Sequence, residues 1–268
     1  MHKQHPLKLR IQTQEKHKMP RLNELYAENM KNHPYGYALY HPTSTKVLYP
    51  GCVGYFDGLG HWHPVTHVET ASTPFSRSTQ ALDLAPQSTL TWSLPLCSSS
   101  VRTCTVGISS EALPAGASCK FVSSTDFGAV LATAGEEVVR DTYYYSAPFR
   151  EWLKDNAQAL IKARPEVRDH GVWVVATTYS TRKCSIAAWT SRDVEVVVGI
   201  KAAAAALGPL SGRKLNRNGT ESAFEAKEEC ERLVVFVGGV RFTYSRLLVC
   251  PPRIALVLGS SVRVLNWV

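Results

Sequence analysis

The stretch from His170 to Ile200, HGVWVVATTYSTRKCSIAAWTSRDVEVVVGI, constrains the fold more than any other part of the chain. It is rich in β-branched and aromatic residues and contains no proline, which is typical of long β-strands. Residues 190–193 predict a turn between two arms, and both arms carry apolar side chains on more than one face. The pattern therefore predicts either the central strands of a sheet or a hairpin that can face lipid on one side and water on the other.

A second region of the same character covers residues 88–134, where small polar and apolar side chains alternate and charges are few. A strand with one face in water normally alternates apolar with polar or charged side chains. We therefore expect a second two-faced hairpin region here. Residues 54–62 predict a shorter hairpin, with aromatic side chains on both sides of an Asp57-Gly58-Leu59-Gly60 turn. Aromatic rings at such a tip suit a lipid interface.

Helical periodicity predicts two main helices. Apolar residues recur at helical spacing over residues 20–30, and this segment fits either a packing helix or a membrane-surface anchor. A longer amphipathic helix is predicted between Ser146, which can cap it, and Pro165, which ends it. We also expect a short charged helix over residues 221–231, followed by a buried strand at residues 233–237.

Composition limits the possible functions. The chain has 268 residues, of which 44% are hydrophobic and 19% charged, which describes a globular protein of one large or two small domains. The net charge of +8 suggests an acidic partner, either nucleic acid or an anionic membrane. The seven cysteines are irregularly spaced and no secretory signal precedes them, so reduced thiols in the cytosol are expected.

Chemistry-bearing motifs are missing from the sequence. There is no nucleophile elbow, P-loop, zinc-protease helix or dinucleotide fingerprint, so no enzyme activity and no cofactor are predicted. His61, His63 and His67 have a spacing that a metal could use, but no cysteine or carboxylate stands convincingly beside them, and a metal site is not predicted. The basic residues are scattered and form no nucleic-acid recognition motif.

The order of these elements resembles the pore-forming N-terminal domain of gasdermins, most of all their short fungal relatives that regulate cell death. A basic N-terminal helix, an aromatic hairpin, a low-charge hairpin region, an amphipathic helix and a long hairpin follow one another over most of residues 20–250. The strongest local likeness is FREWLKDNAQALIKARPEVRDHGVWVVATTYSTRKCSI, in which a helix leads into a strand. The segment ERLVVFVGGVRF lies where a closing core strand is expected.

The resemblance implies an α+β fold with a twisted, mostly antiparallel sheet, long hairpins and flanking amphipathic helices. Residues 1–18 would be a basic arm, residues 19–250 a single pore-forming domain, and residues 251–268 an apolar tail of uncertain role, with no inhibitory C-terminal domain. The protein would be cytoplasmic when soluble. It would bind acidic phospholipids of the plasma membrane and permeabilise it as a homo-oligomeric pore in regulated, allorecognition-like cell death, with a variant partner protein as one means of control.

The resemblance also assigns roles to residues by their order along the chain. The expected lipid-binding residues are Lys8, Arg10, Lys16, Lys18, Arg21 and Lys46, and the expected interfacial aromatic residues are Tyr55, Phe56 and Trp62. The expected membrane-inserting residues, which lie in regions 88–134 and 171–203, are Leu90, Trp92, Leu94, Val106, Ile108, Val130, Leu131, Trp173, Val175, Tyr179, Val194, Val196 and Val198. Cys230 and Cys250 are candidates for a redox-controlled dimer.

An alternative remains open at this point. The long strands could stay in the sheet, and the chain could act as a non-lytic interaction module whose basic face binds an acidic protein or RNA. RNA binding would weaken steeply with salt, whereas inserted hairpins would not be released by it.

Overall fold

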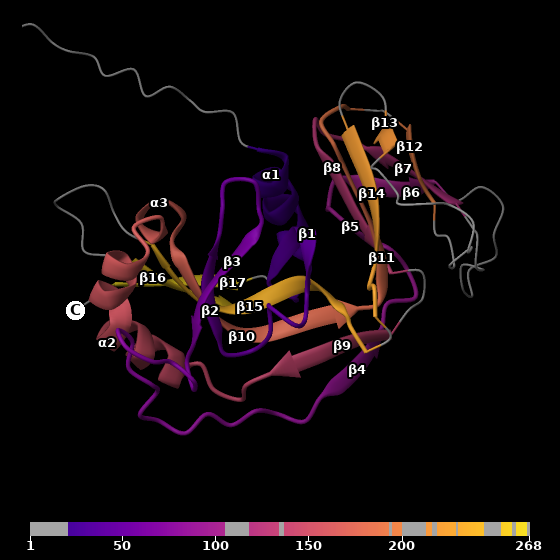
Figure 1. The fold of residues 1–268 in the computed structure, drawn as a ribbon. Helices are drawn as coiled ribbons and strands as arrows, with labels where there is room; N and C mark the ends of the chain where they lie inside the picture. Colours follow the sequence, from indigo (N-terminus) through magenta and orange to yellow (C-terminus); the bar gives the residue numbers. More distant parts are fainter. Residues whose placement is uncertain are drawn as a thin grey trace, which may run out of the picture.

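The chain folds as a mixed α+β protein built mainly from antiparallel sheets, as predicted (Figure 1). This architecture is seen in a computed structural model. It describes residues 21–104, 118–133, 137–192, 195–199, 213–215, 219–228, 230–243, 253–258 and 261–266.

One large sheet, called the body sheet, is organised around two long antiparallel strands, β10 and β15. The first half of β15 pairs with β1 and its second half with β16, which pairs with β17. The first half of β10 pairs with β2, which pairs with β3, and its second half with β9, which pairs with β4. The strands are β1 (Tyr37–Ser44), β2 (Cys52–Phe56), β3 (Trp62–His67), β4 (Ser88–Thr91), β9 (Glu137–Thr142), β10 (Val172–Thr181), β15 (Leu233–Thr243), β16 (Arg253–Leu258) and β17 (Ser261–Asn266).

Both faces of β10 are buried because alternate side chains enter different cores. Val172 and Val174 pack with the apolar side of helix α2 (Ala147–Ala163), which is followed by the short helix α3 (Val167–His170). Trp173 and Val175 face an aromatic cluster formed with β2 and β3. Gly239 of β15 lies so close to β10 that a Cβ there would overlap the carbonyl oxygen of Val174. This close approach requires glycine at that position.

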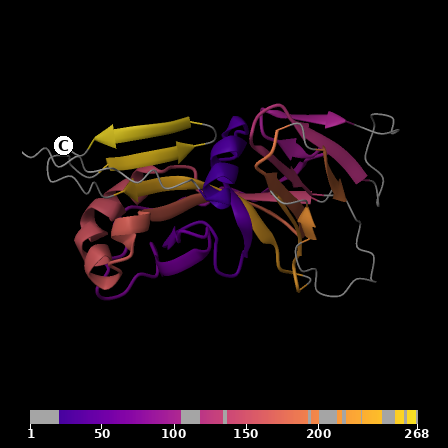
Figure 2. The ribbon, with the colours of Figure 1, turned by 90° about the horizontal axis from the view of Figure 1, so that it is seen from above.

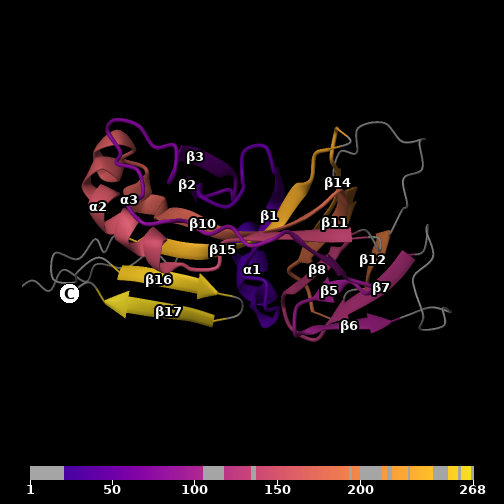
Figure 3. The same ribbon diagram turned by 90° about the horizontal axis from the view of Figure 1, so that it is seen from below.

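A second lobe stands at the end of the body opposite α2 (Figures 1 and 3). Its middle sheet has the order β13-β14-β11-β8-β5, and its distal sheet has the order β12-β7-β6. A buried apolar cluster fills the space between the two sheets. The strands are β5 (Leu96–Cys97), β6 (Val101–Cys104), β7 (Ser118–Ser123), β8 (Gly128–Ala132), β11 (Lys183–Trp189), β12 (Glu195–Gly199), β13 (Arg213–Leu215) and β14 (Gly219–Glu225).

Helix α1 (Leu22–Asn29) and the following turn of 3-10 helix, η1 (Met30–Asn32), lie between the body and the lobe (Figure 2). The predicted N-terminal helix is therefore confirmed, and so is the longer helix α2. Tyr26 and Met30 are fully buried in a cluster that includes residues of β1, β8 and β11, and α1 packs against these three strands. The apolar periodicity of the first helix thus serves packing at a junction.

Two expectations about local structure are wrong. In the described residues, β11 and β12, the arms of the hairpin predicted at residues 170–200, do not pair with each other, because β11 pairs with β8 and β14 while β12 pairs with β7. The first arm is also bent at Arg182, between β10 and β11. Residues 219–225, partly within the predicted charged helix, form β14, and exposure alternates over residues 222–225 as in a strand.

The apolar tail has a clear structural place. Its strands β16 and β17 form an antiparallel hairpin, and β16 pairs with the second half of β15. The tail therefore extends the body sheet.

Candidate functional site

Two long segments leave the body sheet and return to it. Excursion 1 is residues 92–136, between β4 and β9, and excursion 2 is residues 182–232, between β10 and β15. The four flanking strands are neighbours in the order β4-β9-β10-β15. The pairs at the exits are Thr91 with Glu137 and Thr181 with Leu233, and Ser180 pairs with Val139 between them. Both excursions therefore start and end side by side, at the same end of these four neighbouring strands.

Strands β8 and β11 of the middle sheet are buried on both faces. Ala129 and Leu131 of β8 face the cluster under α1, whereas Val130 and Ala132 face the distal sheet. Strand β11 divides in the same way, with Ile186 on the α1 side. Two apolar environments leave no water-facing side, so burial accounts for the low charge of these strands. Low charge alone is therefore not evidence of membrane insertion.

The junction between the body and the lobe is closed by polar contacts as well as apolar ones. The Asn32 side-chain amide donates to the carbonyl oxygen of Cys97 in β5 at 2.9 Å, and a ring nitrogen of His33 lies 2.8 Å from the same oxygen. Burial lowers the pKa of His33, although its bond to the carbonyl acts in the opposite direction. The Tyr26 hydroxyl is buried without a hydrogen-bond partner in the described residues, which weakens the junction.

The turn between β2 and β3 packs against the start of α1. The guanidinium of Arg21 lies over Gly58, where a Cβ would overlap it, and Asn23 lies beside Gly60. Leu59, at the apex of the turn, is 59% exposed. The structure thus brings the predicted lipid-binding Arg21 next to the tip of the predicted hairpin, with an exposed apolar side chain beside it.

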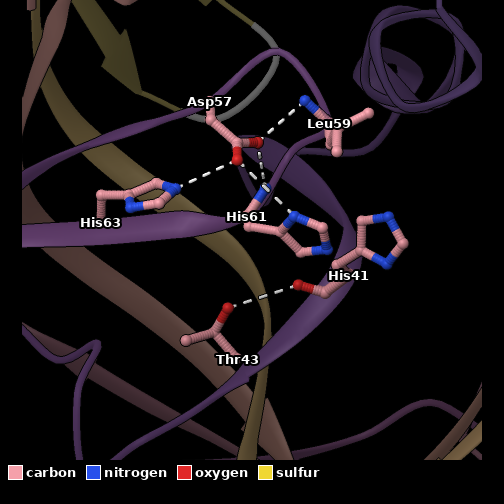
Figure 4. Close-up of polar contacts among 6 residues, drawn as sticks. All are labelled: His41, Thr43, Asp57, Leu59, His61 and His63. Carbon is pink, nitrogen blue, oxygen red and sulfur yellow. Dashed lines mark hydrogen bonds and ion pairs between the residues drawn. The ribbon is translucent and has the colours of Figure 1, made fainter. Parts of the chain in front are cut away.

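Asp57 holds this turn in place (Figure 4). Its carboxylate accepts the backbone N–H groups of Leu59 at 2.8 Å and His61 at 2.9 Å, and lies 3.0 Å from Nε2 of His63. Partial burial pushes the pKa of Asp57 upward, but these hydrogen bonds outweigh it and hold the pKa well below its usual value. The His61 ring stacks on His41 with 4.6 Å between centroids. The cluster fixes the turn, and the described residues contain no group arranged to bind a metal.

Lys46 lies at the other end of β2 from Arg21, in the connection between β1 and β2. Its ammonium pairs with Glu228 at 2.6 Å. The structure therefore does not bring these two predicted lipid-binding residues together. The remaining four, Lys8, Arg10, Lys16 and Lys18, lie outside the described residues.

The predicted aromatic tip is not at the surface. Tyr55, Phe56 and Trp62 are at most 9% exposed, because their rings pack in the two cores that flank β10. The expectation of an exposed aromatic tip is therefore wrong for this conformation. The exposed apolar side chains of these connections are Val47 and Tyr49, before β2, and Leu59.

The predicted inserting residues fall into four groups. Trp173, Val175 and Tyr179 lie in β10 within the body, so the region expected to rearrange, residues 171–203, is divided between the body and the lobe. Leu90 belongs to β4 and is partly buried, Trp92 is buried, and Leu94 is 66% exposed. The buried lobe residues are Val130, Leu131, Val196 and Val198, and those outside the described residues are Val106, Ile108 and Val194.

Sequence reasoning missed four members of the apolar cluster between the middle and distal sheets as site residues. Phe121, Ala132, Ala187 and Trp189 are at most 2% exposed and complete that cluster. Their two-residue alternation within residues 118–132 and 183–189 was the available signal.

The described cysteines are free thiols. Cys230 is exposed, whereas Cys184 is buried and its burial raises the pKa of its thiol to about 12. Cys250, the other predicted redox residue, lies outside the described residues.

Comparisons with known proteins give a structural similarity but no sequence match. No family model matches the sequence, and no curated protein matches it. A solved structure of a bacterial gasdermin from Bradyrhizobium tropiciagri is similar over 89% of this chain and 88% of that chain, with 11% identity and a TM-score of 0.33. A similarity of this size carries no functional conclusion for this chain. Among the described residues, no helix is long and apolar enough to cross a membrane.

Proposed function

We propose that the protein is a gasdermin-like pore former that binds acidic membrane lipids, oligomerises and inserts hairpins from excursions 1 and 2. One observation carries the proposal: both excursions leave and re-enter the body sheet at the same end of four neighbouring strands, β4, β9, β10 and β15. If the excursions extend, β4, β9, β10 and β15 continue as two adjacent hairpins. Each excursion is longer than two arms of the ~9–11 residues that cross a bilayer as strands.

Membrane docking is proposed at the N-terminal side of α1. Arg21 and the exposed Leu59 lie together there, and the chain just before Arg21 carries Lys16 and Lys18. Each basic residue near an anionic surface contributes ~1 kcal/mol of binding, so a small group of them supports docking. Lys8 and Arg10 would add to this group, while Lys46 would have to leave Glu228 to take part.

Dye release from liposomes tests the proposal. Purified protein in reductant is expected to empty vesicles that contain anionic lipid and to leave neutral vesicles intact. Charge reversal of Lys16, Lys18 and Arg21 together should abolish release. Reversal of the exposed Lys154 on α2, at the other end of the body, is the matched control and should not.

The opposite result has a defined meaning. If no vesicle composition is emptied, the excursions stay folded, and salt-sensitive binding of an acidic protein or RNA becomes the function to examine. Cytoplasmic storage, action at the plasma membrane in a cell-death response, control by a variant partner, and thiol control through Cys230 and Cys250 are further parts of the proposal. Thiol control predicts that Cys250→Ser alters lytic activity or oligomeric state under oxidant.

A further inference from the structure

The same strand order recurs in the body, middle and distal sheets. The body contains β4-β9-β10-β15, the middle sheet contains β5-β8-β11-β14, and the distal sheet contains β6-β7-β12. Each middle strand continues the body strand that holds the same place in this order: β4 leads to β5, β8 to β9, β10 to β11 and β14 to β15. Unrelated sheets would have no reason to repeat one order.

The register of the two inner strands is also nearly preserved from sheet to sheet. From the body sheet to the middle sheet, the paired residue numbers rise by six along β10 and β11 (180 to 186) and fall by eight along β9 and β8 (139 to 131). From the middle sheet to the distal sheet, the paired residue numbers rise by ten along β11 and β12 (186 to 196) and fall by ten along β8 and β7 (131 to 121). Equal movement in opposite directions is the property of a single antiparallel ladder. The pairs compared are Val139–Ser180, Leu131–Ile186 and Phe121–Val196.

The outer strands show where the ladder is interrupted. On excursion 1, from the body sheet to the middle sheet, the paired residue numbers rise by five from β4 to β5 (91 to 96) and fall by six from β9 to β8 (137 to 131). From the middle sheet to the distal sheet, they rise by five from β5 to β6 (96 to 101) and fall by eight from β8 to β7 (131 to 123). The largest mismatch is on excursion 2, where residues 226–232 form a connection that is tied to the loop after β1 by the Lys46–Glu228 ion pair.

The fold buries apolar side chains of this ladder between two of its sheets. The middle and distal sheets enclose side chains from β7, β8, β11 and β12, all at most 2% exposed. On both inner strands the enclosed positions change parity between the two sheets. A straightened ladder in this register therefore places the enclosed residues of β8 and β11 on one face and those of β7 and β12 on the other. The enclosed side chains are Phe121, Val130, Ala132, Ala187, Trp189, Val196 and Val198.

We propose that excursions 1 and 2 form one pre-registered antiparallel ribbon, bent between the body and middle sheets and again between the middle and distal sheets. Insertion straightens both bends while the inner strands keep their partners, and the enclosed apolar side chains leave the lobe core. This inference rests on the proposed function, because the straightened ribbon is the form that enters the membrane. It differs from unfolding and re-pairing, since the backbone hydrogen bonds between β8 and β11 never break.

A disulfide staple distinguishes straightening from re-pairing. Ala132 of β8 and Ser185 of β11 are directly opposite, and both are small. Side chains at directly opposite positions are close enough for a disulfide. The test variant is Ala132→Cys with Ser185→Cys, in a Cys230→Ser background that removes the exposed thiol among the described cysteines. The matched control is Ala132→Cys with Ala187→Cys, since Ala187 pairs with Val130 and the two cysteines are out of register.

The stapled protein is expected to release dye from anionic vesicles at the same rate as its reduced form, and the control pair should form no disulfide with or without vesicles. Release that is lost on oxidation and restored by reductant would overturn the proposal, as would a disulfide in the control pair when vesicles are added. If the first variant fails to fold, Ala129→Cys with Ala188→Cys gives the same test, because these residues are also opposite. If wild type and reduced variants release no dye at all, the proposed function itself is wrong and the inference falls with it.

Discussion

Met30 provides a direct test of how the lobe is held against the body. Its side chain is fully buried beneath the junction, among residues of β1, β8 and β11. Replacing a buried methionine by alanine removes these contacts and leaves a cavity, at a cost of about 2–5 kcal/mol. A helix as short as α1, with eight residues, is not stable alone. We therefore expect Met30→Ala to undock α1 and loosen the lobe before the body unfolds.

The size of the effect follows from that cost. At the lower limit, about 2 kcal/mol raises the equilibrium constant for local opening about 30-fold. Amide hydrogen exchange read by mass spectrometry should show acceleration of that order in β8 and β11, with the interior of β10 and β15 unchanged. Leu160→Ala is the matched control, because Leu160 is equally buried but belongs to α2 and the body core.

The comparison of the two variants decides the question. If Met30→Ala and Leu160→Ala accelerate the same segments, or if Met30→Ala accelerates all segments equally, the junction is not a separate opening unit. In that case α1 would be an ordinary part of one cooperative core.

Three further outcomes are expected. Gly239→Ala should lower the free energy of unfolding in urea by several kcal/mol, about as much as other buried steric clashes, since its Cβ would overlap the Val174 carbonyl; an unchanged midpoint would contradict the close approach. Burial lowers the pKa of His33, so the unfolded chain takes up this proton more readily than the folded one. The neutral His33 ring therefore contributes its full share of folding stability above about pH 6.5, and this share is lost as the pH falls. His33→Gln should flatten that part of the pH–stability profile. A maleimide should label Cys230 rapidly in the native protein and Cys184 only on unfolding, and equal rates would show that the Cys184 site is open.

The local sequence pattern predicted the positions of helices and strands better than it predicted which strands pair. The apolar spacing of residues 20–30 and the amphipathic segment after Ser146 both gave helices near the expected bounds, although the Ser146 side chain makes no capping hydrogen bond. Strands were also found at 172–181 and 183–189, where the composition favoured them. These features depend on neighbours within a few residues, and such neighbours are visible in the sequence.

Pairing across long distances was not visible. β12 pairs with β7, which lies far earlier in the chain, and the alternation of residues 195–199 fits equally a hairpin with β11. The charged residues of 221–231 favoured a helix, but pairing with β11 imposes a strand on residues 219–225. The aromatic residues around Asp57 are buried by α2 and β10, which no local pattern in the hairpin indicates.

The sequence pattern did not show the surroundings of the candidate site. The low charge of residues 88–134 and 171–203 predicted two-faced hairpins, but in β8 and β11 its cause in this conformation is burial on both sides. The adjacency of Arg21 to the turn after β2 agrees with the predicted order of elements. The separation of Lys46 from Arg21 depends on the direction of β2, which the sequence does not reveal.

The two buried faces of β8 give alternate residues different structural roles. In β8, Leu131 faces α1 and Val130 faces the distal sheet. A substitution on the first face changes how firmly the lobe is held, whereas one on the second changes the surface that opening would uncover. The threshold for opening and the character of the opened surface can therefore vary independently, within a strand of five residues.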